Sequence, residues 1–486
     1  ELVVAAERFK LLGRVQGLGV RPAIARLAAD LQLAGCVRNT DEGVEVEVAG
    51  TYAALAQFRE RLIPALPRGV RLDHVFSTTI ERTDHAAFEI VGSSGTGARA
   101  AQVPTDRAVC AECLMDVTCP RDARHDYPFT CCANCGPRYS LIGAMPYNRK
   151  QTSMADFALC GHCRREFESL ADRRFHAETI GCPCCGPHVW ATDRDTVVLG
   201  QRTAAISIVI DALLQGRVVA IRGLGGYQLL VDATNRTAVE QLRIRKGRPQ
   251  KPFAILVASL DDAAQLAHLG DAERHALADP ANPIVLARRR ADTNLAPDVH
   301  GTLDTIGLLL PTTPLHWQLV TSINRPLVAT SGNQDSAPLE YEPADTQSNL
   351  ANVADVWLHH NRPIWRPIDD SVVRVIADRV VTLRLARGLA PLPLSLGTTP
   401  PMLAVGGHQK SAVALSNGNQ SVLGPHLGDL DEQGTRARWV EQVAALMDLY
   451  GAEPSVIVHD SHPDYFTTRW AKATGRPTLA VDHHHA

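Results

Sequence analysis

The chain has 486 residues and a formal net charge of −3 at pH 7, with 49 Lys plus Arg against 52 Asp plus Glu. At roughly 150 residues per domain, this length predicts three or four domains. The near-neutral charge argues against a protein whose main role is to coat nucleic acid or an anionic membrane. No run approaches the roughly 20 apolar residues of a membrane span, and no basic and hydrophobic leader opens the sequence. We therefore expect a modular protein of the cytoplasm, without a membrane partner.

The first unit, residues 1–92, has the order strand, helix, strand, strand, helix, strand. Apolar alternation and helical periodicity predict strands over 8–15, 35–39, 44–48 and 88–91, and helices over 21–33 and 52–62. This order is the split βαβ pattern of a ferredoxin-like domain.

A glycine-bearing turn over 13–22 joins the first predicted strand to the first helix. Its amides would point at the helix N-terminus, where an anion is favoured. Arg21 opens that helix and can grip a phosphate with two nitrogens, and the amide of Asn39 could position a water for attack on the phosphorus or acyl centre. Taken alone, glycines and one Arg are more often a turn and a surface charge than a site.

The whole constellation resembles the acylphosphatases. Residues 13–21 read Gly-Arg-Val-Gln-Gly-x-Gly-x-Arg, and Val-Arg-Asn-Thr follows over 37–40, with Gly43 after it. The resemblance implies that Arg21 and Asn39 are the catalytic residues for hydrolysis of an acyl phosphate. Val20 stands where that family more often has an aromatic residue, which is a difference of packing.

Eight cysteines of the second unit, 93–192, stand in four Cys-x-x-Cys pairs. The pairs are Cys110/Cys113, Cys132/Cys135, Cys160/Cys163 and Cys182/Cys185, and the gaps between them are 18, 24 and 18 residues. Two such turns close a tetrahedral cage of four thiolates around zinc. The repeat predicts two zinc ions in a loop-rich, metal-stapled unit, entered through a linker over 93–97.

The spacing leaves the zinc pairing open, because each ion can take adjacent pairs or the outer and inner pairs can nest. A structural role is favoured, since four-thiolate sites have no open position for catalysis. Zinc modules of this kind also hold nucleic acid or a protein partner. Cys36, Cys119, Cys131 and Cys184 fall outside the repeat and are interpreted as ordinary thiols.

The third unit, 200–395, carries a concentration of cations just before a predicted strand at 253–257. The cations are Arg243, Arg245, Lys246, Arg248 and Lys251. Such a cluster is usually a solvated helix end. Here Lys-Gly-Arg-Pro at 246–249 and Lys-Pro-Phe at 251–253 occur with Thr-Ser-Gly-Asn at 330–333 and Asp-Asp-Ser at 369–371, a set that resembles the YrdC/Sua5 family. Recurring alternation of strands and helices predicts a mixed α/β sheet.

Members of that family join a carbamoyl carbon to AMP. The resemblance implies that Lys246, Arg248 and Lys251 bind the triphosphate of Mg-ATP and stabilise the charge that develops on pyrophosphate. It also implies that Ser331 and Asn333 orient the acyl group or the phosphate. Gly332 stands where the family more commonly has Ala.

The last unit, 400–486, opens with a strand, tight turn and strand over 402–415, a pattern that could cradle phosphate as in actin-like ATPases. It resembles the start of a Kae1-like domain, which implies a further metal. His483 is the candidate ligand, because in one family a second His follows four residues later, beyond Ala486. The sequence begins without Met and ends inside this motif, so we expect both ends to be incomplete.

In this order, the four units resemble the HypF family of hydrogenase-maturation carbamoyltransferases over essentially the whole chain. The resemblance implies a multidomain α/β and α+β enzyme that hydrolyses carbamoyl phosphate and forms carbamoyl adenylate from ATP. The carbamoyl group would then pass to the C-terminal cysteine of the partner HypE, as precursor of the cyanide ligands of the nickel-iron hydrogenase. Because carbamate decomposes quickly in water, a closed path between fused sites limits its loss.

Two alternatives belong to other functional classes. A tRNA threonylcarbamoyl enzyme shares YrdC-like and Kae1-like parts but has no use for an acylphosphatase unit. A zinc scaffold that binds nucleic acid is disfavoured by the near-neutral charge. Whether the chain ending at Ala486 performs the final transfer is left open by the sequence, as is the oligomeric state.

Overall fold

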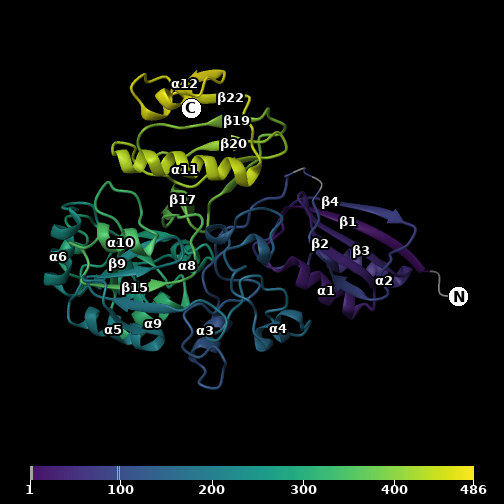
Figure 1. Ribbon diagram of the computed structural model, residues 1–486, viewed down its shortest axis with the longest axis horizontal. Coiled ribbons are helices and arrows are strands. Elements are labelled where there is room, and N and C mark those ends of the chain that lie inside the picture. The colour runs from purple at the N-terminus through teal and green to yellow at the C-terminus, as the bar shows by residue number, and fades with distance from the viewer. Residues whose placement is uncertain (1–3, 96, 98) are drawn as a thin grey trace.

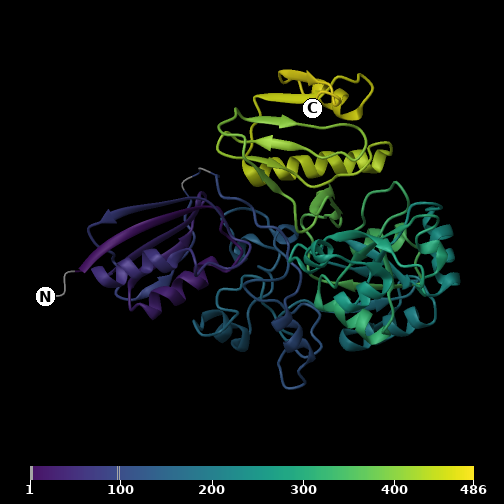
Figure 2. The ribbon, with the colours of Figure 1, turned by 180° about the vertical axis from the view of Figure 1, so that it is seen from behind.

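Four units follow one another in the computed structural model, which describes residues 4–95, 97 and 99–486 (Figure 1). A loop-rich unit lies between the N-terminal unit and the large sheet of the third unit, and the C-terminal unit sits above that sheet. The same arrangement is seen from behind in Figure 2. Thr96 of the predicted linker and residues 1–3 lie outside the described residues.

The N-terminal unit is a five-stranded sheet with two helices. Its elements are β1 (Val4–Arg14), α1 (Val20–Asp30), β2 (Ala34–Asn39), β3 (Gly43–Thr51), α2 (Tyr52–Leu62), β4 (Arg71–Ile80) and β5 (Phe88–Ile90). The strand order is β4-β1-β3-β2-β5, which confirms the ferredoxin-like class. Helix α1 buries Val20, Ile24, Leu27 and Ala28 against the sheet, as a helix with one apolar stripe does.

The strand predicted at 88–91 is confirmed, but its place in the split βαβ pattern was wrong. The strand that completes the split βαβ pattern, antiparallel to β1, is β4. The predicted strand at 88–91 is an additional edge strand, β5, which pairs in parallel with β2. Strand β4 gave little sequence signal because most of its residues are exposed, so apolar and polar residues do not alternate along it.

The second unit consists of loops with two short helices, α3 (Ala111–Thr118) and α4 (Gly161–Glu168), and two 3-10 turns, η1 (Tyr139–Leu141) and η2 (Arg149–Gln151). Cys110 caps the N-terminus of α3, and Cys160 does the same for α4. The cysteines themselves make up much of the small buried clusters here, which is typical of a segment that folds around a metal.

The third unit is built on a 12-stranded mixed sheet. Its elements are β6 (Val189–Thr192), β7 (Val198–Gln201), α5 (Arg202–Leu214), β8 (Val219–Arg222), β9 (Tyr227–Asp232), α6 (Arg236–Lys246), β10 (Ala254–Leu256), α7 (Leu260–Leu266), β11 (Ala267–His268), α8 (Asp271–Ala278), β12 (Ile284–Arg289), η3 (Pro297–Val299), β13 (Thr305–Leu309), α9 (Pro314–Ile323), β14 (Leu327–Ser331), α10 (Pro343–Asn349), β15 (Val356–His360), β16 (Val372–Ile376) and β17 (Arg379–Arg384).

The strand order is β17-β16-β12-β13-β10-β14-β9-β8-β15-β6-β7, with β11 paired to β12. Parallel pairs, such as β8 with β15 and β10 with β13, alternate with antiparallel ones, so the predicted mixed α/β sheet is confirmed. Two buried clusters, one on each side of strands such as β8 and β9, form the largest core of the molecule.

The C-terminal unit is a six-stranded sheet with two helices. Its elements are β18 (Leu392–Leu394), β19 (Met402–Ala404), β20 (Ala414–Ser416), β21 (Ser421–Leu423), α11 (Gln433–Tyr450), β22 (Val456–Asp460), α12 (Phe466–Ala473) and β23 (Thr478–Val481), in the strand order β18-β21-β20-β19-β22-β23. Its core includes Trp439 and continues into Val103, Tyr139 and Tyr147 of the loop-rich unit. Among the described residues, no helix combines the length and apolarity needed to cross a bilayer.

Candidate active sites and metal centres

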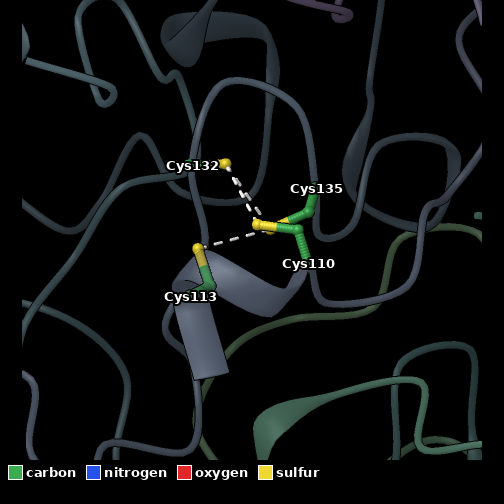
Figure 3. Close-up of side chains that lie close together, drawn as sticks. All are labelled: Cys110, Cys113, Cys132 and Cys135. Atoms are coloured by element: carbon green, nitrogen blue, oxygen red, sulfur yellow. Dashed lines mark hydrogen bonds between the residues drawn. The ribbon is translucent and has the colours of Figure 1, made fainter. Parts of the chain in front are cut away.

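The first metal centre is formed by Cys110, Cys113, Cys132 and Cys135, whose sulfur atoms converge in Figure 3. The Sγ–Sγ separations are 3.8 Å from Cys110 to Cys132, 3.7 Å from Cys132 to Cys135 and 3.5 Å from Cys135 to Cys113. A tetrahedron with Zn–S bonds of about 2.3 Å has sulfur atoms about 3.8 Å apart. The four thiols therefore fit one zinc ion.

The second centre repeats this geometry with Cys160, Cys163, Cys182 and Cys185. Its Sγ–Sγ separations are 3.7 Å, 3.7 Å and 3.6 Å along the same circuit. Each cage thus takes two pairs that are adjacent in the sequence, which settles the pairing that the spacing left open. All eight predicted metal ligands are brought together as expected.

Two arginines link the two cages. Arg124, just before the second pair of the first cage, forms an ion pair with Glu166 of α4 at 2.5 Å. Fifty residues later in the sequence, Arg174 forms the reciprocal ion pair with Asp116 of α3. Each guanidinium also donates to a main-chain carbonyl oxygen of the other finger. The two fingers are therefore clamped to each other by an exchange of charged side chains.

Arginines also donate hydrogen bonds to metal ligands of the other finger. Arg124 Nη2 donates to Cys163 Sγ at 3.3 Å, and Arg173 Nη1 donates to Cys113 Sγ at 3.0 Å. Donation to a thiolate stabilises its negative charge and fixes its orientation, as an outer shell does around a metal. No local sequence pattern predicts this pairing, because the partners come from different fingers.

The predicted acyl phosphate site lies where α1 begins. Gly19 caps α1 at a φ of 78°, and a Cβ atom there would come within 2.7 Å of Asn134 Oδ1 in the loop-rich unit. Glycine therefore allows both the left-handed turn and the close approach of the neighbouring unit. Arg21 follows on the first turn of α1, and Asn39 ends β2.

Both predicted catalytic side chains are buried and contact the loop-rich unit. Arg21 Nη2 forms an ion pair with Glu178 Oε1 at 2.5 Å, and both side chains are less than one tenth exposed. Asn39 Nδ2 donates to the carbonyl oxygen of Tyr147 at 2.7 Å. Gln16 joins the two units as well, since its Oε1 accepts from Tyr147 N at 2.8 Å.

Arg21 and Asn39 line a common cavity of about 20 Å³, closed on its other side by the loop-rich unit. Tyr147, His176 and Glu178 are among the lining residues from that unit. Burial, and secondarily the charge of Arg21, lowers the pKa of His176 to about 4, so this imidazole is neutral at pH 7. The space is about that of one water molecule.

The predicted nucleotide-binding residues lie around a cavity of about 300 Å³ between the third and fourth units. Arg248, Lys251, Ser331 and Asn333 line it. The lining also includes Asp335, Asp369, Asp370, Arg384 and Asp429, of which Asp429 comes from the C-terminal unit. Lys251 forms an ion pair with Asp335 at 3.4 Å.

Lys246 is only 1% exposed and lies behind the wall of this cavity. Its Nζ donates to Ser331 O at 2.7 Å, to Asn333 O at 2.5 Å and to Asn333 Oδ1 at 2.8 Å. Burial, followed by the charge of Arg248, lowers the pKa of Lys246 to about 7. Three acceptors need three N–H donors, which the ammonium form supplies. In this geometry Lys246 holds the 331–333 loop in place.

The candidate ligand His483 donates a hydrogen bond from Nδ1 to Asp460 Oδ2, at the end of β22, at 2.8 Å. Asp482, His483 and His484 have ligand atoms within 4.8 Å of one another, and all three are exposed. Imidazole and carboxylate groups suit a transition metal or zinc. The assignment of His483 as a metal ligand stays a prediction.

Sequence reasoning missed the residues that close the first cavity. Glu178 and Tyr147 come from loops that lie more than 100 residues after Arg21 and Asn39, and no local pattern marks them. Asp335 was also missed, although it lies two residues after Asn333 and its carboxylate pairs with Lys251 of the predicted site.

Four family models match successive parts of the chain. They are described as acylphosphatase over 7–90, HypF finger over 109–142 and 159–192, telomere recombination (Sua5/YciO/YrdC) over 211–386, and HypF Kae1-like domain over 397–486. These matches confirm the four predicted domain types in their predicted order.

Relatives that are similar over nearly the whole of this chain support the same assignment. The chain is 41% identical to carbamoyltransferase HypF of Rhodobacter capsulatus, over 99% of this chain and 64% of that protein, and 39% identical to HypF of Synechocystis, over 98% and 62%. A crystal structure of full-length HypF in the phosphate- and nucleotide-bound form superposes with a TM-score of 0.95 at 35% identity, covering 99% of this chain and 63% of that one. The chain thus spans less than two thirds of the length of these relatives, and it belongs to the HypF family.

Proposed function

We propose that the protein is an ATP-dependent carbamoyltransferase of nickel-iron hydrogenase maturation. It hydrolyses carbamoyl phosphate at Arg21 and Asn39, joins the released carbamate to AMP in the cavity lined by Arg248 and Lys251, and passes the carbamoyl group to the C-terminal cysteine of HypE. We place the activity in the cytoplasm, where the thiolates of two zinc cages stay reduced.

The observation that carries the proposal is the contact between Arg21 and Glu178. A buried guanidinium at the N-terminus of a helix binds an oxyanion there, in this case a carboxylate oxygen at 2.5 Å. The phosphate of an acyl phosphate offers the same kind of oxygen and more negative charge, so it competes for the same donors. Because the cavity has room for about one water, substrate binding requires Glu178 to leave Arg21.

In the first step, a water held by Asn39 attacks the phosphorus of carbamoyl phosphate. The bond between phosphorus and the bridging oxygen breaks, and carbamate leaves while the proton of the water passes to the phosphate oxygens. Arg21 stabilises the charge on the equatorial oxygens during this displacement. The match to the acylphosphatase model favours carbamoyl phosphate as donor over threonine with bicarbonate.

In the second step, a carbamate oxygen attacks the α-phosphorus of ATP, and pyrophosphate leaves. Arg248 and Lys251 stabilise the pyrophosphate, and Ser331 and Asn333 orient the carbamoyl group. Magnesium enters with the nucleotide, and the Asp369 carboxylate in the cavity lining is a ligand of the kind that magnesium takes. Lys246 supports this site through the 331–333 loop.

The domain bounds are part of the proposal: acylphosphatase-like over 1–92, tandem zinc finger over 93–192, YrdC-like over 200–395 and Kae1-like over 400–486. Strand pairing supports small shifts at two borders. Strand β6 (Val189–Thr192) pairs with β15 of the third unit, and β18 (Leu392–Leu394) pairs with β21 of the fourth.

Phosphate release from carbamoyl phosphate tests the first step. Arg21→Ala should abolish it and should leave ATP-pyrophosphate exchange with an adenylate analogue unchanged, because the two sites lie in different units. Arg26→Ala is the matched control, since Arg26 also lies on α1 but donates to loop carbonyl oxygens outside the cavity. Equal phosphate release by the protein and its Arg21→Ala variant would contradict the assignment.

A further inference from the structure

The cavity at Arg21 contains two buried polar atoms without partners. Asn39 is 1% exposed and Tyr147 is 2% exposed, yet neither Asn39 Oδ1 nor the Tyr147 hydroxyl has a hydrogen-bond partner among the residues that the structure describes. Both residues line the same small cavity. Buried polar groups are almost always paired, so two orphans in one cavity indicate that something polar binds there.

The orientation of the Asn39 amide is fixed. Its Nδ2 donates to the carbonyl oxygen of Tyr147, which can only accept, so the free atom is Oδ1, an acceptor. An acceptor here suits the attacking water of the proposed reaction. With that water bound, both polar atoms of the Asn39 amide have a partner, and the Tyr147 hydroxyl is still without a role.

The Tyr147 hydroxyl is a donor at neutral pH. Burial raises the pKa of Tyr147 to about 12, although the charge of Arg138 lowers it, so the phenol stays protonated at pH 7. Tyr147 lines the same cavity as Arg21, the proposed phosphate-binding group. A neutral O–H group pairs well with a carbonyl or phosphoryl oxygen, and a second cation is not required for this contact.

We propose that the Tyr147 hydroxyl binds the substrate in the acyl phosphate site, donating a hydrogen bond to an oxygen of the acyl phosphate held by Arg21. The inference rests on the proposed function of this site. It assigns part of the substrate pocket to the zinc-binding unit, whereas Arg21 and Asn39 come from the acylphosphatase-like unit. The zinc cages then have a role in catalysis through the wall that they hold in place.

Tyr147→Phe tests the proposal because it removes only the hydroxyl. Deleting an unpartnered group should leave the thermal midpoint of unfolding unchanged or slightly raised. We expect kcat/KM for hydrolysis of carbamoyl phosphate by the zinc-loaded chain to fall about tenfold, the loss of one hydrogen bond to a charged group. Zinc content should stay at two per chain.

Tyr127→Phe is the matched control. Tyr127 is also buried in the zinc-binding unit, but its hydroxyl donates to Pro187 O at 3.0 Å, away from the cavity. This variant should lower the thermal midpoint and leave kcat/KM unchanged, the opposite of the result for Tyr147→Phe.

Two outcomes overturn the inference and separate it from the proposed function. If Tyr147→Phe keeps the kcat/KM of the unmodified chain while Arg21→Ala is inactive, the hydroxyl binds only a water and the proposed function stands. If Tyr147→Phe loses thermal stability and kcat/KM together, the hydroxyl has a purely structural role, and the proposed function again stands. If the unmodified chain releases no phosphate from carbamoyl phosphate, the inference and the proposed function both fail.

Discussion

Arg21 and Glu178 form a buried ion pair at 2.5 Å, although 157 positions separate them in the sequence. The pair joins the first helix of the N-terminal unit to the second zinc finger. It places a carboxylate on the guanidinium that the acylphosphatase resemblance assigns to phosphate. Under the proposed function, Glu178 therefore occupies the place of the substrate oxyanion in this closed cavity.

Glu178→Gln should strengthen phosphate binding. Phosphate has to displace a charged carboxylate in the unmodified chain, but only a neutral amide in the variant, so we expect the inhibition constant of inorganic phosphate against carbamoyl phosphate hydrolysis to fall about tenfold. Without phosphate the thermal midpoint should fall, because Arg21 loses its counter-charge. Phosphate should restore it.

Glu166→Gln is the control for that experiment, since Glu166 pairs with Arg124 instead of Arg21. It should lower the midpoint without any rescue by phosphate. An unchanged or higher inhibition constant in Glu178→Gln would mean that the carboxylate does not compete with phosphate.

Loss of one zinc cage should weaken the other. Cys132→Ser should reduce the zinc content from two to one per chain, because three thiolates bind zinc less tightly than four. The arginine exchange between the fingers predicts that a chelator then removes the remaining zinc faster than from the intact chain. Cys119→Ser is the control, since Cys119 is an exposed thiol outside both cages. A release rate identical to that of the intact chain would show that the fingers bind zinc independently.

Substitutions of Lys246 and Lys251 should distinguish a lysine that supports the nucleotide cavity from a lysine that binds ATP. Lys246→Met removes three hydrogen bonds that the buried ammonium group donates, so we expect a loss of about 3 kcal/mol in the free energy of unfolding and loss of ATP binding with it. Lys251→Met changes an exposed side chain, which should alter stability by less than about 0.5 kcal/mol. Its ATP affinity should nevertheless fall about tenfold. Calorimetric titration with ATP and urea denaturation would check both, and a stable Lys246→Met variant would contradict the supporting role.

Acid should destabilise the third unit through His316. Burial lowers the pKa of His316 to about 4, whereas an unfolded histidine titrates near pH 6.5. Between these values the unfolded state binds more protons, so stability is full above about pH 6.5 and is lost as the pH falls toward 4. Between pH 7.0 and 5.5 this amounts to about 1 kcal/mol for one histidine.

The measurement is urea denaturation of the unmodified chain and of His316→Gln at both pH values. His316 Nε2 pairs with Gln228 and Nδ1 with Thr313, so the variant should be less stable at pH 7.0. Its deficit should shrink at pH 5.5, because only the unmodified chain loses the histidine contribution. An equal deficit at the two pH values would exclude the buried neutral imidazole.

The sequence predicted most features that depend on local spacing. Cysteine pairs, apolar alternation over residues 8–15, and the glycine turn before Arg21 are all local patterns with direct physical meaning. Features that depend on contact between units could not be predicted. Nothing near Glu178 or Tyr147 marks them as partners of a helix that lies more than 100 residues earlier.

Lys246 shows the same limit within one unit. Its neighbours in the sequence are cations, which suggested an accessible phosphate-binding group. Only the fold reveals that the carbonyl oxygens of Ser331 and Asn333 close around its ammonium group. Burial of a charged side chain is decided by the elements that pack over it, and a sequence window does not contain them.

Release of pyrophosphate from ATP, with carbamoyl phosphate as the only carbamoyl donor, tests the central claim most directly. The unmodified chain should release pyrophosphate only when carbamoyl phosphate is present, and Arg21→Ala should release none. Ammonium bicarbonate, which forms carbamate in solution, should restore release by Arg21→Ala because it bypasses the first site. Pyrophosphate release by Arg21→Ala from carbamoyl phosphate alone, or no rescue by carbamate, would contradict a relay between two sites.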